Sequence, residues 1–176
     1  MSEVNKGYIK LYHGSYLGVE EPKILTPVRA LDFGAGFYTT SSFKQASSWA
    51  KRQIRMRKFS QQGESEKGIV TCFSFNEEEA RKNLKILFFE KADSEWLTFV
   101  AKNRTLADVK HFDLVIGPVA DDKTMAVVSD YIRGRYSHEE AIKRLKPFVL
   151  DDQYAFSSKK ALGYLTYEGV VEIETD

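Results

Sequence analysis

The sequence predicts a single α+β domain, and three observations favour this class. Hydrophobic residues make up 43% of the 176 residues and charged residues 29%, a balance typical of globular domains. Candidate strands and helices alternate, but not in the regular order of a doubly wound sheet. No repeat, low-complexity segment or change of composition divides the chain, so residues 1–176 are expected to form one domain.

The first half of the chain is predicted to contain two short strands, a long loop and a helix. Residues 8–12 and 37–40 are predicted to be the strands, and residues 16–36, with their prolines and glycines, the loop. Ser42 and Gln45 have the spacing of a capping box, which predicts that a helix begins there. The apolar face of this helix is predicted to consist of Phe43, Ala46, Ala50 and Ile54.

The second half of the chain is predicted to alternate between strands and helices. Strands are predicted at residues 68–75, 84–89, 113–116, 153–156 and 170–174. Helices are predicted to begin at Asp93 or Ser94, near Asp122 and after Ser137, and residues 158–165 are predicted to form a helical turn or two.

A basic cluster late in the first helix precedes a polar loop predicted at residues 61–68. The cluster consists of Lys51, Arg52, Arg55, Arg57 and Lys58. It is either a solvated helix end, where the helix dipole favours cations, or a docking surface for an acidic macromolecule. Trp49 and Trp96 are expected to lie in the core.

The composition limits the classes of partner. The formal net charge is +1, so no overall field draws the protein to nucleic acid or anionic lipid. No apolar run approaches the ~20 residues that span a bilayer, and residues 1–6 lack a signal-peptide core, which predicts a cytoplasmic protein without membrane contact. The single cysteine, Cys72, is expected to be a buried core thiol, and His111 and His138 lack partners at ligand spacing, so no metal is expected.

Three short motifs carry residues suited to binding a ligand. Residues 12–15 (YHGS) place the imidazole of His13 at a strand end, beside a glycine that lets a ligand approach the backbone. Residues 31–40 (LDFGAGFYTT) place a glycine-rich turn before Tyr38, whose flat face could stack on an aromatic ring. Gln153 opens a late strand and could reach a ligand between the first two motifs. Taken alone, each motif is more typical of an ordinary turn or strand end.

In this order, the motifs resemble those of the His-Tyr-Glu branch of the ADP-ribosyltransferases, the branch of diphtheria toxin and the poly(ADP-ribose) polymerases. The chain is more closely similar to a bacterial family of unknown function. That family has the motifs Tyr-His-Gly-Ser, Leu-Asp-Phe-Gly-x-Gly-Phe-Tyr-Thr-Thr, Gly-Pro-Val-Ala-Asn/Asp-Asp and Gln-x-x-Phe. They correspond here to residues 12–15, 31–40, 117–122 and 153–156, so the resemblance covers nearly the whole chain.

The resemblance implies a split β-sandwich, in which two small antiparallel sheets with flanking helices enclose an NAD cleft. The NAD site would comprise His13, Gly14, Ser15, Arg29, Gly36, Phe37 and Tyr38. In it His13 would bond a ribose, Gly14 would meet the carboxamide, and Tyr38 would stack on the nicotinamide. Arg29, just before the glycine-rich turn, would face the diphosphate or simply lie on the surface.

Gln153 stands where this branch has its catalytic Glu. An amide accepts a hydrogen bond from a ribose hydroxyl, but it supplies no negative charge to an oxocarbenium-like transition state. The neighbouring Asp151 would share the facing of Gln153 along a strand, and Asp152 would have the opposite one.

The leading hypothesis is mono-ADP-ribosyl transfer from NAD to an unidentified macromolecular acceptor, with Gln153 as the catalytic residue. The resemblance also implies a toxin or effector-type module that an antitoxin or regulatory protein restrains. Two alternatives remain open: a catalytically weak or inactive NAD- or ADP-ribose-binding module, and a structural interaction domain on the same fold.

Overall fold

The computed structural model describes residues 7–25, 30–60, 67–106 and 111–174. Arg29 and most of the loop predicted at residues 61–68 lie outside these ranges. Along the chain the elements are β1 (Tyr8–Ser15), β2 (Phe37–Thr39), α1 (Phe43–Phe59), β3 (Lys67–Asn76), α2 (Glu77–Asn83), β4 (Ile86–Phe88), α3 (Ser94–Arg104), β5 (Leu114–Pro118), α4 (Asp122–Ile132), α5 (His138–Leu145), β6 (Asp152–Phe156), α6 (Lys159–Leu162) and β7 (Leu165–Glu174).

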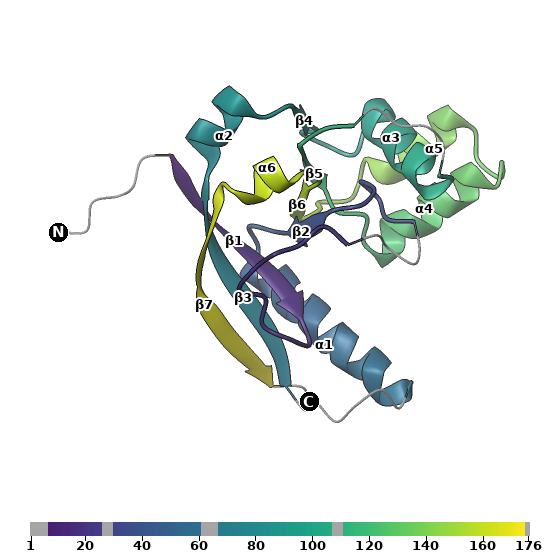
Figure 1. The fold of residues 1–176 in the computed structure, drawn as a ribbon. Helices are drawn as coiled ribbons and strands as arrows, with labels where there is room; N and C mark the ends of the chain where they lie inside the picture. Colours follow the sequence, from purple (N-terminus) through teal and green to yellow (C-terminus); the bar gives the residue numbers. More distant parts are fainter. Residues whose placement is uncertain (1–6, 26–29, 61–66, 107–110, 175–176) are drawn as a thin grey trace.

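The strands of the described residues form two small sheets, which confirms the α+β class (Figure 1). The first sheet has the order β1-β3-β7 and is antiparallel throughout. The second has the order β2-β6-β5-β4 and is mixed, because β4 and β5 run parallel. The expectation that both sheets are antiparallel is therefore wrong for the second sheet, in which β4 and β5 are parallel. The connection from β4 through α3 is long enough to bring the chain back in the same direction.

One pair of residues joins the two sheets. The backbone N–H of Tyr12 donates to the Thr40 carbonyl at 2.8 Å, and the N–H of Thr40 donates back to Tyr12 at 3.0 Å. Beyond this pair β1 continues along β3, whereas β2 continues along β6. The two strands therefore separate at His13, and the sheets split at that residue.

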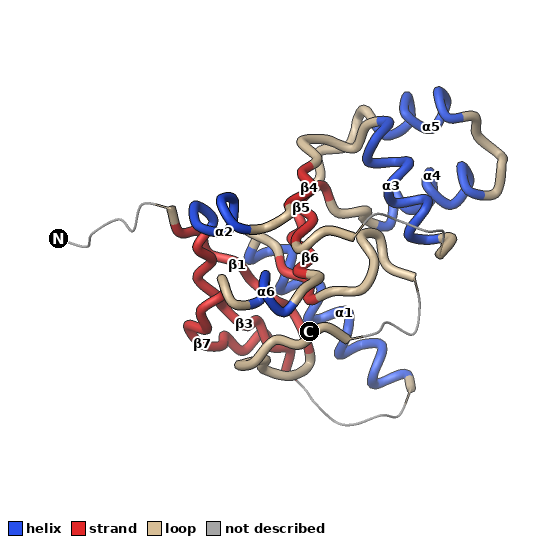
Figure 2. The backbone as a smooth tube through the Cα atoms, turned by 45° about the horizontal axis from the view of Figure 1, so that its top comes forward, coloured by secondary structure: helices blue, strands red, loops and turns tan. Residues whose placement is uncertain are grey.

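Two apolar cores lie on the two faces of the second sheet, because side chains along a strand alternate between faces. The inter-sheet core is formed chiefly by Leu11, Phe37, Phe73, Phe75, Leu114, Ile116, Tyr154 and Phe156. The helix-side core is formed chiefly by Phe33, Trp96, Leu97, Val100, Val115, Val128, Leu145 and Ala155. Figure 2 shows α3, α4 and α5 grouped beside the second sheet and away from β7. The second sheet is thus the middle layer of the domain.

Helix α1 packs against β1 and β3 on the face of the first sheet that turns away from the inter-sheet core (Figure 1). Ser42 caps the helix by accepting a hydrogen bond from the Gln45 N–H at 3.2 Å, as the capping box predicts. Of the predicted apolar face, Phe43 is 38% exposed, whereas the other three members are buried: Ala46, Ala50 and Ile54. Small alanines let the helix approach the strands closely.

Several details differ from the sequence-based expectations. Trp49 is 39% exposed, although Trp96 is buried as expected. Cys72 is half-buried, so it is not a fully enclosed core thiol. Helix α2 was not predicted, although Asn76 caps it by accepting from the Glu79 N–H. These differences concern the periphery and leave the predicted order of the main elements intact.

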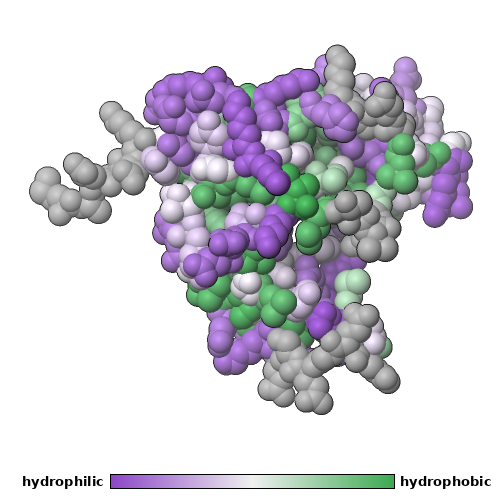
Figure 3. Space-filling view, viewed as in Figure 1, coloured by the Kyte–Doolittle hydropathy of each residue, from purple (hydrophilic) through white to green (hydrophobic). Residues whose placement is uncertain are grey.

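Strand β7 is longer than predicted, because it begins at residue 165 and not at residue 170. It forms the free edge of the first sheet, and Val170 and Val171 are 46% and 40% exposed there. Figure 3 shows apolar surface over this region of the molecule. No helix within the described residues is long and apolar enough to cross a membrane.

Candidate functional site

The ring of His13 bridges β1 and β2 at the point where they separate. Its Nδ1 lies 2.7 Å from the carbonyl oxygen of Tyr38, and the ring stacks on Phe37 with centroids 4.5 Å apart and planes at 30°. A carbonyl oxygen only accepts hydrogen bonds, so Nδ1 carries the proton and donates it. In the neutral ring, Nε2 is therefore the acceptor.

The surroundings of His13 keep its ring neutral. Burial lowers the pKa of His13 below its usual value, and the hydrogen bond to Tyr38 opposes this only in part. Among the described residues none hydrogen-bonds to Nε2. The split between the sheets therefore presents an unused, neutral acceptor nitrogen, and a sugar hydroxyl is a donor that suits it.

The hydroxyl of Tyr38 closes the glycine-rich turn. It donates to the Gly34 carbonyl at 2.6 Å and accepts from the Phe33 N–H at 3.1 Å. Gly34 has a φ of 83°, a left-handed conformation that favours glycine at this point of the turn. Burial raises the pKa of Tyr38 further above the neutral range. The hydroxyl is thus committed to the turn, and only the ring remains to contact a ligand.

The two glycines of the predicted site are required by close packing. A Cβ on Gly14 would lie 1.9 Å from the carbonyl oxygen of Ala46, so α1 can lie on β1 only if residue 14 is glycine. A Cβ on Gly36 would lie 2.8 Å from the carbonyl oxygen of Phe156 in β6. The structure therefore gives both glycines a packing role, and it shows no opening at the Cβ position of either one.

The remaining members of the predicted NAD site are also accounted for. Ser15 is buried at the end of β1, where its Oγ accepts from the Leu17 N–H at 3.4 Å. Phe37 is 6% exposed and supports the ring of His13 from within the inter-sheet core. Arg29 lies outside the described residues. Phe37 therefore positions the imidazole and does not line an open surface.

Gln153 points from β6 toward the helix-side core, on the same face as Ala155. Its side chain is buried, at 7% exposure, and its Nε2 has no hydrogen-bond partner in the described part of the chain. An enclosed N–H group without a partner is costly, by about 1–3 kcal/mol, so its presence points to a group that can bind it. That residue 153 contacts a ligand stays a prediction.

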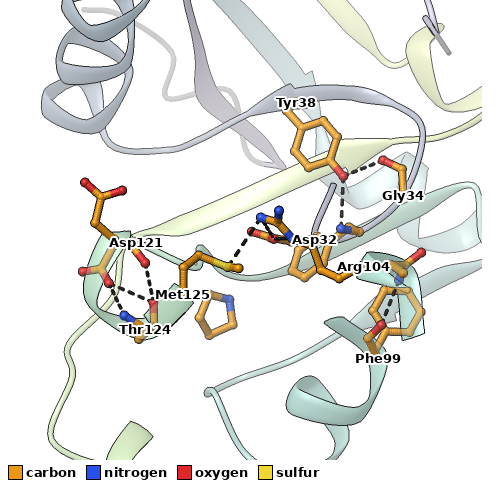
Figure 4. A network of polar contacts seen from close by, with 12 residues as sticks. Asp32, Gly34, Tyr38, Phe99, Arg104, Asp121, Thr124 and Met125 are labelled. Carbon is orange, nitrogen blue, oxygen red and sulfur yellow. Dashed lines mark hydrogen bonds and ion pairs between the residues drawn. The ribbon is translucent and has the colours of Figure 1, made fainter. Parts of the chain in front are cut away.

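A partly buried ion pair between Asp32 and Arg104 lies near Tyr38 (Figure 4). Asp32 is 7% exposed, and its Oδ1 accepts from Arg104 Nε at 2.7 Å and Nη2 at 2.5 Å. Burial raises the pKa of Asp32 above its usual value, while Arg104 opposes the rise. This pair could not be predicted from the sequence, because its members are 72 residues apart.

Asp152 ties the start of β6 to the start of α1. Its carboxylate accepts from the Ser41 N–H at 2.8 Å and from Thr40 Oγ1 at 3.0 Å, and it also bonds the Ser41 hydroxyl. Asp151, considered above as a companion of Gln153, is exposed. Asp152 thus holds β6 beside the residue pair that joins the two sheets.

The three predicted motifs come together on adjacent strands. The order β1, β2, β6 places His13, Tyr38 and Gln153 on three neighbouring strands, across roughly 10 Å of sheet. The side chain of His13 points from β1 toward the inter-sheet core, whereas that of Gln153 points from β6 toward the helix-side core. The two side chains therefore point to opposite faces of the second sheet.

An exposed ion pair joins α1 and α4. Arg52 Nη1 pairs with Asp122 Oδ1 at 2.9 Å, which links the two helices across exposed surface. The guanidinium of Arg52 also lies over the ring of Trp49, 5.4 Å from its centroid. Arg52, a member of the basic cluster, therefore already has partners within the protein. Arg57 similarly lies 3.9 Å from the ring centroid of Tyr16.

Comparison with known proteins places the chain in a family. A family model described as "Protein of unknown function (DUF3990)" matches residues 9–167, a range that includes all of the motifs above. No curated protein and no solved structure matches the chain. Within the described ranges, no group of three or more His, Cys, Asp and Glu residues could hold a metal ion.

Proposed function

The chain belongs to this uncharacterised family, and we propose that it is a mono-ADP-ribosyltransferase that uses NAD to modify a macromolecular acceptor. The observation that carries the proposal is the state of His13: a neutral ring, fixed by the Tyr38 carbonyl, with its Nε2 acceptor unused in the split between the sheets. A nicotinamide nucleotide offers ribose hydroxyls that donate to such a nitrogen.

The architecture supports the same proposal. Within the described residues, the two small sheets are joined at one residue pair, and α1 follows directly after β2. This arrangement agrees with the split β-sandwich that the sequence resemblance implies, apart from the parallel pair in the second sheet. In this proposal NAD binds where β1 and β2 separate, beside β6.

Three residues would divide the recognition of NAD between them. His13 Nε2 would accept from a ribose hydroxyl, and the ring of Tyr38 would pack against the nicotinamide. Gln153 would accept through Oε1 a hydrogen bond from the hydroxyl of the nicotinamide ribose, and its unpaired Nε2 would donate to an acceptor atom of the ligand. Gly14 and Gly36 would act by letting the surrounding elements pack closely.

The reaction would break the C–N bond between the nicotinamide and its ribose. The electron pair leaves with neutral nicotinamide, and the ribose carbon takes up positive charge until a nucleophile of the acceptor bonds to it and releases its proton. Negative potential near this carbon lowers the barrier only if it interacts more strongly with the transition state than with NAD. The acceptor and a restraining antitoxin or regulatory protein belong to this proposal, and only the resemblance supports them.

A second candidate is an NAD- or ADP-ribose-binding module without catalysis. It is favoured by the amide at Gln153, and by the engagement of the nearby carboxylate of Asp32 with Arg104. Isothermal titration calorimetry with NAD, read beside nicotinamide release in cell extract, separates the candidates. An enzyme binds NAD, releases nicotinamide and transfers label from NAD to an acceptor. A binding module gives the heat of binding alone, and a structural domain gives none of the three signals.

A further inference from the structure

The outward side of α1 carries a stripe of exposed apolar side chains. Trp49, Met56 and Phe59 are 39%, 51% and 90% exposed. With Arg52 they are spaced three, four and three residues apart, so the four side chains form one stripe along the helix, called here the apolar stripe. Helix α1 packs chiefly against β1, β3 and β7 through its other side, and it lies at the outside of the molecule (Figure 1). Exposed apolar side chains gathered in this way mark a surface that binds another molecule.

The charges on α1 are all of one sign. Residues 43–59 contain six of the chain's 26 basic side chains and none of its 25 acidic ones, so the rest of the chain has 20 basic against 25 acidic side chains. Lys44, Arg55 and Lys58 are exposed, and their spacing places them along one side of the apolar stripe, called here the basic flank. Positive charge is therefore concentrated on this one helix, although the whole chain is almost neutral.

The spacing of the apolar stripe fits a second α-helix. Two helices that pack side by side at about 20° bury residues that repeat on average every 3.5 positions, in alternating steps of three and four. The stripe from Trp49 to Phe59 has these steps over two repeats. Its side chains are also of the types enriched in protein–protein interfaces, namely Trp, Met, Phe and Arg. A helix that packs here meets the basic flank, so carboxylates on that side of the helix complement it.

Two features of the surface favour a protein helix over a nucleic acid or an anionic membrane. The carboxylate of Asp122, 86% exposed, lies beside the stripe because it pairs with Arg52. An extended polyanion laid along α1 would meet this carboxylate and the net negative charge of the rest of the chain. Single-stranded nucleic acid binds by stacking its bases on flat aromatic side chains, and Met56, in the middle of the stripe, offers none.

We propose that the outward side of α1 binds an acidic amphipathic α-helix of another protein. The apolar side chains of that helix pack on Trp49, Met56 and Phe59, and its carboxylates lie against the basic flank. Arg52 exchanges its ion pair with Asp122 for a carboxylate of the bound helix. The surface is formed by residues outside the candidate NAD site, so this proposal does not depend on the proposed function.

The test uses a synthetic helix as the probe. A fluorescein-labelled peptide of about three heptads carries Leu at the two apolar positions of each heptad and Glu beside them, and a second peptide has the same composition in scrambled order. In fluorescence anisotropy at about 0.15 M salt, the first peptide should bind wild type at least about tenfold more tightly than the second. Binding should also shift the emission of Trp49 to shorter wavelength, because Trp49 becomes buried whereas Trp96 is already buried. Trp49→Phe should remove this shift.

Matched variants locate the apolar contact. The double variant Met56→Ala, Phe59→Ala should weaken binding of the acidic peptide at least about tenfold, because it removes two side chains of the stripe. The control is the double variant Leu25→Ala, Val149→Ala, which removes equally exposed apolar side chains outside α1 and should change the affinity by less than about twofold. Circular dichroism confirms that the proteins are folded.

Charge variants test the basic flank and the exchange at Arg52. Arg55→Glu should weaken binding at least about tenfold, whereas Arg133→Glu, at the exposed C-terminal end of α4, should change it by less than about twofold. Asp122→Asn should strengthen binding about two- to fivefold, because the carboxylate that competes for Arg52 is removed. Glu140→Gln, at an exposed ion pair on α5, should leave the affinity unchanged.

The same protein is titrated with vesicles containing phosphatidylserine and with an oligo(dT) strand. Neither should bind in a way that the stripe variants weaken. If either one does, or if the acidic peptide binds wild type no better than its scrambled form, the proposal is overturned. Equal losses in the stripe variant and its control would also overturn it. All of these measurements are made without NAD, so a failure of the proposed function leaves their outcome unaffected.

Discussion

Replacing His13 by alanine should destabilise the protein measurably. The variant loses the hydrogen bond from Nδ1 and leaves the Tyr38 carbonyl without that partner, which costs about 1–3 kcal/mol. It also loses the stacking on Phe37, worth about 0.5–1.5 kcal/mol. Together these losses predict that His13→Ala lowers the free energy of unfolding by about 1.5–4.5 kcal/mol.

Urea unfolding at pH 7.5, followed by circular dichroism, measures this loss. His111→Ala is the matched control, because His111 is exposed and its removal should change the free energy of unfolding by less than about 0.5 kcal/mol. A loss in His13→Ala no larger than in the control would refute the reasoning. It would mean that the ring is not held between β1 and β2 as described.

The difference in stability between wild type and His13→Ala should depend on pH. The pKa of His13 is lowered in the folded protein, so as pH falls the unfolded chain takes up the proton first. Wild type should therefore lose stability as pH falls below about 6.5, and the advantage of wild type over His13→Ala should shrink in that interval. An advantage that is constant from pH 7.5 to pH 5 would contradict the neutral, enclosed state of the ring.

Two further substitutions test the scaffold around the split. Gly14→Ala should cost about 3 kcal/mol in urea unfolding, because the added Cβ would lie 1.9 Å from the Ala46 carbonyl oxygen. Gly163→Ala, whose Cβ would meet nothing closer than 3.3 Å, should cost less than about 1 kcal/mol, and equal losses would contradict the packing argument. Tyr38→Phe should cost about 1–2 kcal/mol by freeing the glycine-rich turn, yet keep NAD affinity within about threefold in calorimetry. A folded Tyr38→Phe protein that no longer binds NAD would show that the hydroxyl, and not the ring, contacts the ligand.

The helix starts could be predicted because their signals are local. Ser42, Asp93 and Ser137 each cap a helix where the sequence predicts one, since a capping side chain bonds an N–H only two or three residues away. Asn76 has the same spacing to Glu79, so the sequence also carries a capping signal for α2. A helix start can therefore be predicted from sequence wherever a capping residue and its partner have the right spacing.

The features that depend on distant partners could not be predicted in the same way. Nothing in residues 86–88 or 114–118 specifies that β4 and β5 pair in parallel, because the direction follows from how α3 returns across the sheet. The Asp32–Arg104 pair likewise forms only when α3 packs against the glycine-rich turn. The motifs predicted which strands carry the candidate site, but not the faces toward which His13 and Gln153 point.

The central claim is that NAD lies in the split and bonds to Nε2 of His13. The most direct measurement is an NMR titration with NAD of protein carrying ¹⁵N-labelled histidine. The ring nitrogens of His13 should report a protonated Nδ1 and an unprotonated Nε2 before NAD is added. With NAD, the Nε2 signal of His13 should shift and saturate, while those of His111 and His138 stay in place. No change at His13 up to millimolar NAD would contradict the account.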